Sequence, residues 1–172
     1  GKITATIRGK LDSWADGKFD AGSTDLNDVP NKIPDVGVKW GGGIQGQGMP
    51  WEDYLSTQLS GTSRLPPNFK TFDFFDQVNG TAISAKTLNT QTAARLAKPE
   101  QLFNSLKGNV DAVGRFDRYT LDGFSLKSSD ISARQVHVAV PEATNAMQWQ
   151  QIQRAIEYGA SRNVEVIITP VR

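Results

Sequence analysis

Apolar and polar residues recur along the chain in patterns that predict both strands and helices. Two short runs, 69–75 and 81–88, are rich in β-branched and aromatic residues, and the Asn79-Gly80 pair between them predicts a turn. Further along, four apolar residues recur at spacings of three and four, which predicts an amphipathic helix. The full set of expected elements is helices over 50–59, 89–116 (with Pro99 starting a second helix or bending the first) and 145–159, a hairpin over 118–126 around Asp122-Gly123, and strands over 69–75, 81–88, 134–140 and 164–171.

This order of elements favours one central mixed sheet flanked by helices. The predicted fold class is therefore α/β (mixed), with a hairpin that protrudes from the sheet. Pro50 and two acidic residues open the first helix, and Gly159 is placed to end the last one.

The first 40 residues differ from the rest of the chain in composition, because turn-forming residues predominate in them. One short strand is expected over 2–8, but residues 12–35 are mostly Asp, Gly, Asn and Pro, which favour turns and loops. Their Asp spacing does not fit an EF-hand. We interpret 1–42 as a linker or the tail of a preceding region, 41–48 (GGGIQGQG) as a flexible hinge, and 43–172 as the folded domain.

Composition narrows the function only slightly. The 172 residues include 19 basic and 18 acidic side chains, so any nucleic-acid surface must be a local patch. The absence of cysteine excludes disulfides and thiolate zinc sites. No apolar run is long enough to cross a membrane, and the start at Gly1 looks like that of a cut fragment.

Candidate chemistry gathers on the two strands joined by Asn79-Gly80. Ser84 and Lys86 are two residues apart and share a face at about 6.7 Å, and the hairpin brings Asp73 roughly opposite them. If the strand is regular, Asp73 shares a face with Phe75, and Lys86 is at least half-buried. Such a patch could bind one cation beside a water molecule. The alternative for Asp73 and Lys86 is a purely structural ion pair. Glu52 also has a structural explanation, because the helix dipole favours a carboxylate in the first turn of a helix whatever the function.

A resemblance gives these residues more weight. The chain resembles the PD-(D/E)xK nuclease superfamily in having Glu52 on a helix, Asp73 on a strand and Lys86 on the next strand. Ser84 stands where the superfamily usually has its second acid. Five blocks, GIQGQGMPWEDYL, RLPPNFKTFDFF, SAKTL, LKGNVDAV and QRAIEYG, are together similar to the C-terminal DNase toxins of contact-dependent growth inhibition (CdiA) proteins. The likeness runs from about Gly43 to the C-terminus and leaves 1–40 as the tail of a cell-entry region.

The resemblance implies a zinc-dependent DNase site at Glu52, Asp73, Ser84 and Lys86. Asp73 and Ser84 would contact the metal directly, and Glu52 would do so directly or through water. Lys86 would orient or help to deprotonate the attacking water. A serine hydroxyl is a weaker ligand than the usual carboxylate, so the identity of the metal stays open. Zn²⁺ is expected, and Mg²⁺ or Mn²⁺ are the alternatives.

The resemblance also implies a cognate immunity protein and delivery of the toxin into the cytoplasm of a competing bacterium. The immunity protein is expected to dock on the hairpin, at Tyr119, Thr120, Leu121, Asp122, Gly123, Phe124, Ser125, Leu126 and Lys127. Two rival functions remain open at this stage: an RNase, for example one that cuts tRNA, and a non-catalytic binding module.

Other residues have ordinary structural explanations. His137, the only histidine, lies on the strand face opposite Val136 and Val138 and is expected to be structural or solvent-facing, with a site contact as the alternative. Trp149 is expected in the core, and Lys107 and Arg115 are weak candidates for DNA phosphate contacts.

Overall fold

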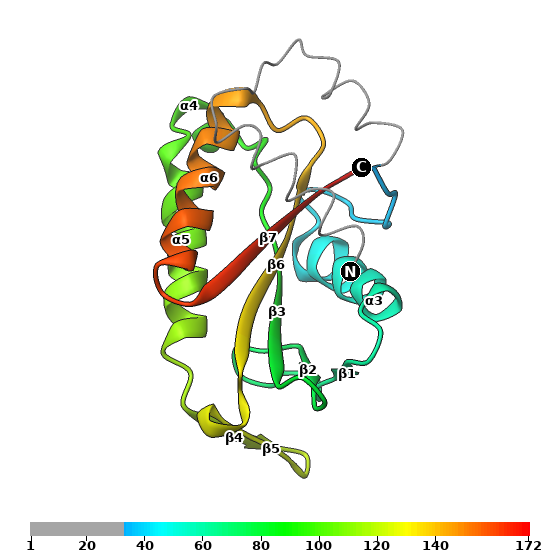
Figure 1. Cartoon of the computed structure of the whole chain (residues 1–172). Helices are drawn as coiled ribbons and strands as arrows, with labels where there is room; N and C mark the ends of the chain where they lie inside the picture. Colours follow the sequence, from blue (N-terminus) through cyan, green and yellow to red (C-terminus); the bar gives the residue numbers. More distant parts are fainter. Residues whose placement is uncertain (1–32) are drawn as a thin grey trace.

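The computed structural model describes residues 33–172, which form a five-stranded sheet with helices on both faces (Figure 1). The sheet order is β1-β2-β3-β6-β7, antiparallel from β1 to β3 and parallel from β3 to β7. The predicted central mixed sheet is confirmed. Its strands are β1 Ser63–Arg64, β2 Phe74–Asp76, β3 Thr81–Thr87, β6 Ala133–Pro141 and β7 Val164–Val171.

Two layers of helix cover the sheet. Helices α5 (Glu100–Gly114) and α6 (Ala146–Ala160) lie side by side on one face, and α3 (Met49–Gln58) covers the other (Figure 1). The apolar stripe predicted on α5 is buried: Leu102, Leu106, Val110 and Val113. On the opposite face Trp51 and Leu55 of α3 pack against Phe74 and Ile83. No helix among the described residues is long and apolar enough to span a membrane.

Pro99 separates two helices, which confirms the first of the two expected outcomes, that Pro99 starts a second helix. Helix α4 (Ala93–Ala97) starts at the Thr92 N-cap, whose hydroxyl accepts a hydrogen bond from the Arg95 N–H, and α5 starts after Pro99. Residues 89–91 are not helical, so the predicted start at residue 89 was wrong. Helix α6 likewise ends at Ala160 instead of Gly159.

The hairpin around Asp122-Gly123 is confirmed. Strands β4 (Arg118–Leu121) and β5 (Phe124–Lys127) form a separate two-stranded sheet that projects from the body of the domain (Figure 1). Asp122 and Gly123 both have positive φ, as a type I′ turn requires. The short 3₁₀ helix Ser128–Asp130 then leads into β6.

The glycine-rich segment differs from the expected hinge. Ile44–Gly48 forms a π-helical turn that continues directly into α3, and the Lys39 N–H donates a 2.7 Å hydrogen bond to the Gly46 carbonyl. A Cβ on Gly42 would lie 2.9 Å from the Lys39 carbonyl oxygen, so glycine permits a close backbone contact here. Before this turn, Val38 is buried on the α3 side of the sheet. The strand expected over 2–8 lies outside the described residues.

The strand predicted over 69–75 is mostly a loop. Only Phe74–Asp76 pairs with β3, because Thr71 has a φ of 70° and breaks the extended backbone. The predicted sharing of faces was therefore wrong. Phe72 packs with Phe75 in the cluster under α5 and α6, and Phe74 packs on the α3 side.

Candidate active site

The candidate site lies where β2 separates from β3. Pairing of these strands ends at Phe74 and Ile83, whereas β3 continues to Thr87 along β6. The next residue of the departing strand is Asp73, whose backbone N–H donates to the Ile83 carbonyl at 2.8 Å. Its side-chain Oδ2 accepts a 2.7 Å hydrogen bond from the Ala85 N–H. We call this point the β2–β3 fork, formed by Asp73, Ser84, Ala85 and Lys86.

Asp73 is held in an environment that disfavours its charge. Burial raises the pKa of this carboxyl to about 6, although the hydrogen bond from Ala85 lowers it. Glu52 raises the pKa further by charge repulsion, and Lys86 and Arg64 lower it. The charges of Glu52 and Lys86 thus both influence the Asp73 carboxyl, but the joint role of these residues in one catalytic site stays a prediction.

Ser84 contributes an unusual hydroxyl to the fork. The residue is fully buried, and its Oγ has no hydrogen-bond partner among the residues that the structure describes. Since buried hydroxyls almost always have a partner, this orphan oxygen, one residue before the Ala85 N–H that Asp73 accepts, calls for an explanation. A bound ligand would supply the missing partner.

Lys86 is exposed, which corrects the expectation of a lysine at least half-buried in its strand. The described ion pairs within 4.0 Å do not include Asp73 with Lys86. Lys86 acts on Asp73 through its longer-range field. Its ammonium group is therefore available to a substrate at the fork.

Glu52 reaches the site from α3 and is held by a residue that the sequence did not single out. Arg64 of β1 donates from Nε to Glu52 Oε1 at 3.0 Å and from its NH1 group to Asp53 Oδ1 at 2.8 Å. Arg64 pairs in register with Phe74, so its backbone lies beside Asp73. No local pattern in the sequence marks Arg64, because β1 has only two residues.

The helix dipole explains Glu52 less well than the sequence suggested. The helical backbone already begins at Ile44, two turns before Glu52, whereas dipole effects fade within the first turn. The ion pair with Arg64 is the described contact that holds Glu52 in place.

The donor set of this site fits a single small cation. Two carboxylates, on Glu52 and Asp73, and the orphan Oγ of Ser84 are oxygen donors of the kind that Mg²⁺ and Mn²⁺ prefer and that Zn²⁺ accepts. The described residues contain no cluster of three or more His, Cys, Asp or Glu side chains placed to hold a metal. A cation at the fork would therefore depend on Ser84 and on water to complete its ligands.

A second polar link closes the far end of β3. Gln47, from the π-helical turn, donates from Nε2 to the Thr87 hydroxyl at 3.1 Å and accepts from the Gly41 N–H at 2.7 Å. This contact fixes the segment before α3 one residue beyond Lys86. The sequence contained the glycines that build the turn, but their flexibility was the wrong interpretation.

The other side chains considered in the sequence lie either in the core or on the surface. His137 is buried, its Nε2 lies 2.9 Å from Gln135 Oε1, and burial lowers its pKa to about 4. Trp149 is in the core, as predicted. Lys107 forms an ion pair with Asp111 at 3.2 Å, so its proposed DNA contact loses support. Arg115 is exposed at the end of α5.

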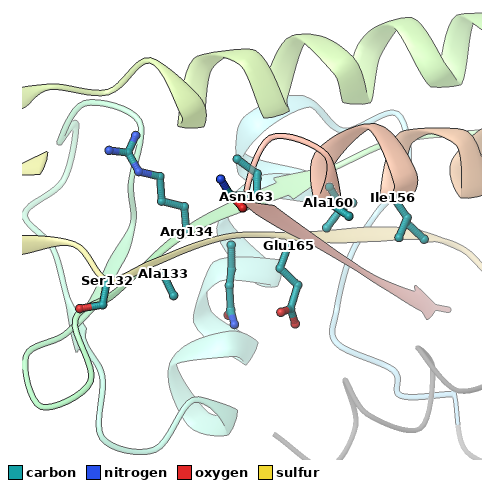
Figure 2. A pocket seen from close by; sticks show the side chains of 10 residues that line it. Ser132, Ala133, Arg134, Ile156, Ala160, Asn163 and Glu165 are labelled. Atoms are coloured by element: carbon teal, nitrogen blue, oxygen red, sulfur yellow. The ribbon is translucent and has the colours of Figure 1, made fainter.

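A hollow elsewhere on the domain, lined by both polar and apolar residues, does not include the candidate residues. It lies at the start of β6 and β7 and the end of α6, and Figure 2 shows Ser132, Arg134, Asn163 and Glu165 around it. Glu52, Asp73, Ser84 and Lys86 are not among its lining residues. The Arg134 guanidinium is engaged, because it donates to the carbonyls of Val113, Gly114 and Phe116.

Comparison with known proteins identifies relatives of this chain. It is 49% identical over 137 residues to Deoxyribonuclease CdiA of Yersinia pseudotuberculosis serotype O:3 (strain YPIII). It is also 49% identical over 138 residues to Deoxyribonuclease CdiA-o11 of Escherichia coli O157:H7 (strain EC869). Each match covers 80% of this chain but only 13% and 37%, respectively, of the relatives.

A solved structure has the same fold. The toxin in the CdiA-CT/CdiI toxin and immunity complex from Yersinia pseudotuberculosis matches with a TM-score of 0.66 at 48% identity. The match covers 72% of this chain and 100% of that one. Residues 47–169 also match the family described as the CDI toxin restriction endonuclease-like domain. The chain belongs to the family of CDI toxin restriction endonuclease-like domains.

Proposed function

We propose that this domain is a metal-dependent endodeoxyribonuclease toxin of a contact-dependent growth inhibition system, with its catalytic centre at the β2–β3 fork. The observation that carries the proposal is the desolvated Asp73 carboxylate bonded to the Ala85 N–H, together with the buried, unpartnered Oγ of the preceding residue, Ser84. The relatives named as deoxyribonucleases support DNA as the substrate.

Asp73, Ser84 and Glu52 would hold the cation, for which we favour Zn²⁺ over Mg²⁺ or Mn²⁺. A bound cation supplies Lewis acidity toward a phosphate oxygen and lowers the pKa of a coordinated water. Oxygen donors alone would also suit magnesium or manganese, and the small number of protein ligands is what supports zinc, because zinc is usually four-coordinate whereas magnesium needs six ligands.

The protein side chains have separate tasks. The two carboxylates would attract the cation and hold it at the β2–β3 fork. The exposed Lys86 ammonium donates hydrogen bonds to a non-bridging phosphate oxygen and orients the water that attacks phosphorus. This positive charge stabilises the negative charge that develops on the phosphate.

The hairpin β4–β5 is proposed to bind the cognate immunity protein. The solved relative comes from a toxin and immunity complex, and this hairpin is a separate sheet with two free edges. Its apolar side chains, including the buried Leu126, face the domain, so the backbone edges and the polar face stay accessible. We further propose that the domain acts in the cytoplasm of the target bacterium, as a DNase toxin requires.

Plasmid nicking tests this proposal. Purified domain is incubated with supercoiled plasmid, and in parallel with tRNA, in the presence of zinc, magnesium, manganese or a chelator. Lys86→Ala and Asp73→Asn, each checked for folding by circular dichroism, serve as site variants. We expect cation-dependent nicking by the wild type and a loss of at least about 100-fold in both variants. Cleavage of tRNA with intact plasmid would assign the domain to RNA instead.

A further inference from the structure

The backbone immediately before Asp73 adopts a rare conformation. The Phe72 N–H donates a 2.8 Å hydrogen bond to the Lys70 carbonyl, and Thr71 between them has a φ of 70°. This is a classic γ-turn, the strained form of the three-residue turn, and a β-branched residue is disfavoured in it. Such strain persists only when surrounding contacts enforce it.

Aromatic contacts enforce it on both sides of the turn. Phe72 is fully buried and packs edge-to-face on Phe116 at a ring separation of 5.0 Å. On the other side Phe69 packs edge-to-face on Tyr119 at 5.1 Å and on Phe124 at 5.7 Å, which are both residues of the hairpin. The turn is therefore fixed between the core and the base of the hairpin.

The γ-turn changes which way the next side chains point. Phe72 and Phe75 share one apolar cluster although they are three residues apart, whereas a regular strand would direct them to opposite faces. In that regular strand Asp73 would share a face with Phe75 and point toward the apolar cluster. The turn instead leaves the carboxylate at the strand edge, where its Oδ2 accepts the Ala85 N–H.

We propose that Thr71 is a positioning residue, whose left-handed backbone fixes the Asp73 carboxylate at the β2–β3 fork. The inference rests on the proposed function in one respect, that Asp73 is a group the reaction uses. Two further hydrogen bonds transmit the constraint, because the Asp73 backbone N–H and carbonyl bond to Ile83 and Leu65 at 2.8 Å each.

The chain offers a matched control for this proposal. Asn68 also has a positive φ, 67°, but it lies in a separate turn closed by the hydrogen bond from the Phe69 N–H to the Pro66 carbonyl. Thr71→Gly and Asn68→Gly therefore both relieve left-handed strain and both free the backbone. Only the first change lies within two residues of Asp73.

The experiment makes two measurements on the wild type and on both variants. The first is the rate of amide hydrogen exchange at Ala85, and the second is the zinc affinity of DNA-free protein, measured by calorimetry. For Thr71→Gly we expect exchange of the Ala85 amide about tenfold faster and zinc binding about tenfold weaker, without a loss of melting temperature. For Asn68→Gly we expect both values to stay within about twofold of the wild type. Equal effects of the two glycines, or an unchanged Ala85 amide in Thr71→Gly, would overturn the proposal.

A third variant separates the backbone from the side chain. Thr71→Ala removes the hydroxyl and the methyl group but keeps a Cβ, and hence retains the backbone restriction. An increase in Ala85 exchange as large as that of Thr71→Gly would assign the effect to the side chain and contradict the proposal. Because Ala85 exchange needs neither metal nor DNA, it reports positioning even if the wild type binds no zinc and cuts no DNA.

Discussion

The Asp73 carboxylate takes the place of a backbone acceptor: its Oδ2 receives the Ala85 N–H at 2.7 Å where β2 has left β3. A single hydrogen bond thus ties the acidic group to the strand that carries Ser84 and Lys86. The carboxylate remains mostly buried beside Glu52, so the native fold holds a charge that it disfavours.

Removing this charge is expected to stabilise the domain at neutral pH. The pKa of Asp73 is raised to about 6 in the folded state from 3.8, so above pH 6 the ionised group lowers native stability. Asp73→Asn should be more stable than the wild type by roughly 2–3 kcal/mol at pH 7.5 in chelator. The gain should shrink as the pH falls through 6 and vanish near pH 4. Urea denaturation at several pH values measures it, and a less stable variant at pH 7.5 would contradict the raised pKa.

Ser84 and Thr144 form a matched pair of buried hydroxyls with opposite expectations. Ser84 Oγ lacks a partner, whereas Thr144 Oγ1 donates to the Pro141 carbonyl at 2.6 Å and lies 2.8 Å from Thr90 Oγ1. Without metal, Ser84→Ala should raise stability by about 1 kcal/mol and Thr144→Val should lower it by about 1–3 kcal/mol. Chemical denaturation in chelator compares them. If Ser84→Ala is as destabilising as Thr144→Val, the hydroxyl has a structural partner and the site loses its main support.

Glu52 and Asp53 share one guanidinium but should differ in cation binding. Arg64 bonds both carboxylates, yet only Glu52 acts on the pKa of Asp73. Glu52→Gln should weaken zinc binding at least about tenfold, whereas Asp53→Asn should change it less than about threefold. Calorimetric titration of zinc into the two variants provides the comparison. Equal losses would mean that only the general negative charge near Arg64 matters.

His137 should make the domain sensitive to acid. Its pKa is lowered from 6.5 to about 4 by burial, so below pH 6.5 the unfolded chain takes up a proton that the native state refuses. Stability should fall by roughly 2–3 kcal/mol between pH 6.5 and 4 from this residue alone.

Asp73 changes stability in the opposite direction over the same pH range. The comparison is therefore made in Asp73→Asn protein, with and without His137→Gln. The variant with both changes should show the flatter pH profile. Parallel profiles would exclude His137 as the source of the acid sensitivity.

The free edges of the hairpin should determine binding of the immunity protein. In a two-residue hairpin the residues next to the loop are hydrogen-bonded to each other, so the following pair, Thr120 and Ser125, direct their N–H groups outward. Thr120→Pro removes such a donor on the β4 edge and Ser125→Pro on the β5 edge. Loss of binding of the cognate immunity protein by at least about tenfold is expected for one of them.

Thr120→Ala and Ser125→Ala serve as controls that keep both N–H groups, and calorimetry measures all four affinities. If both proline variants bind like their alanine controls, strand addition to this hairpin is excluded.

Most of the fold could be predicted where local chemistry determined local structure. The Asn79-Gly80 and Asp122-Gly123 pairs marked two turns, and the apolar spacing along α5 marked its buried face. The parallel strands were recognisable as nearly continuous apolar runs, because both of their faces are covered.

The candidate residues of the site come from the sequence and their catalytic role stays a prediction, whereas the backbone around them could not be predicted. Glu52, Asp73, Ser84 and Lys86 could be selected from residue type and resemblance, whereas the γ-turn at Thr71 could not, because threonine rarely adopts positive φ. The contacts that enforce this turn come from Phe116 and the hairpin, more than 40 residues away in the sequence. The exposure of Lys86, which lies beyond the end of the β2–β3 pairing, also differs from the expectation from the sequence.

The most direct test of the account is a crystal of the domain soaked with zinc and measured at the zinc absorption edge. We predict one anomalous peak at the β2–β3 fork, about 2.0–2.2 Å from an Asp73 carboxylate oxygen and in contact with Ser84 Oγ. A peak elsewhere, or none at the fork, in protein that nicks plasmid with zinc would contradict the assignment of the fork as the catalytic centre.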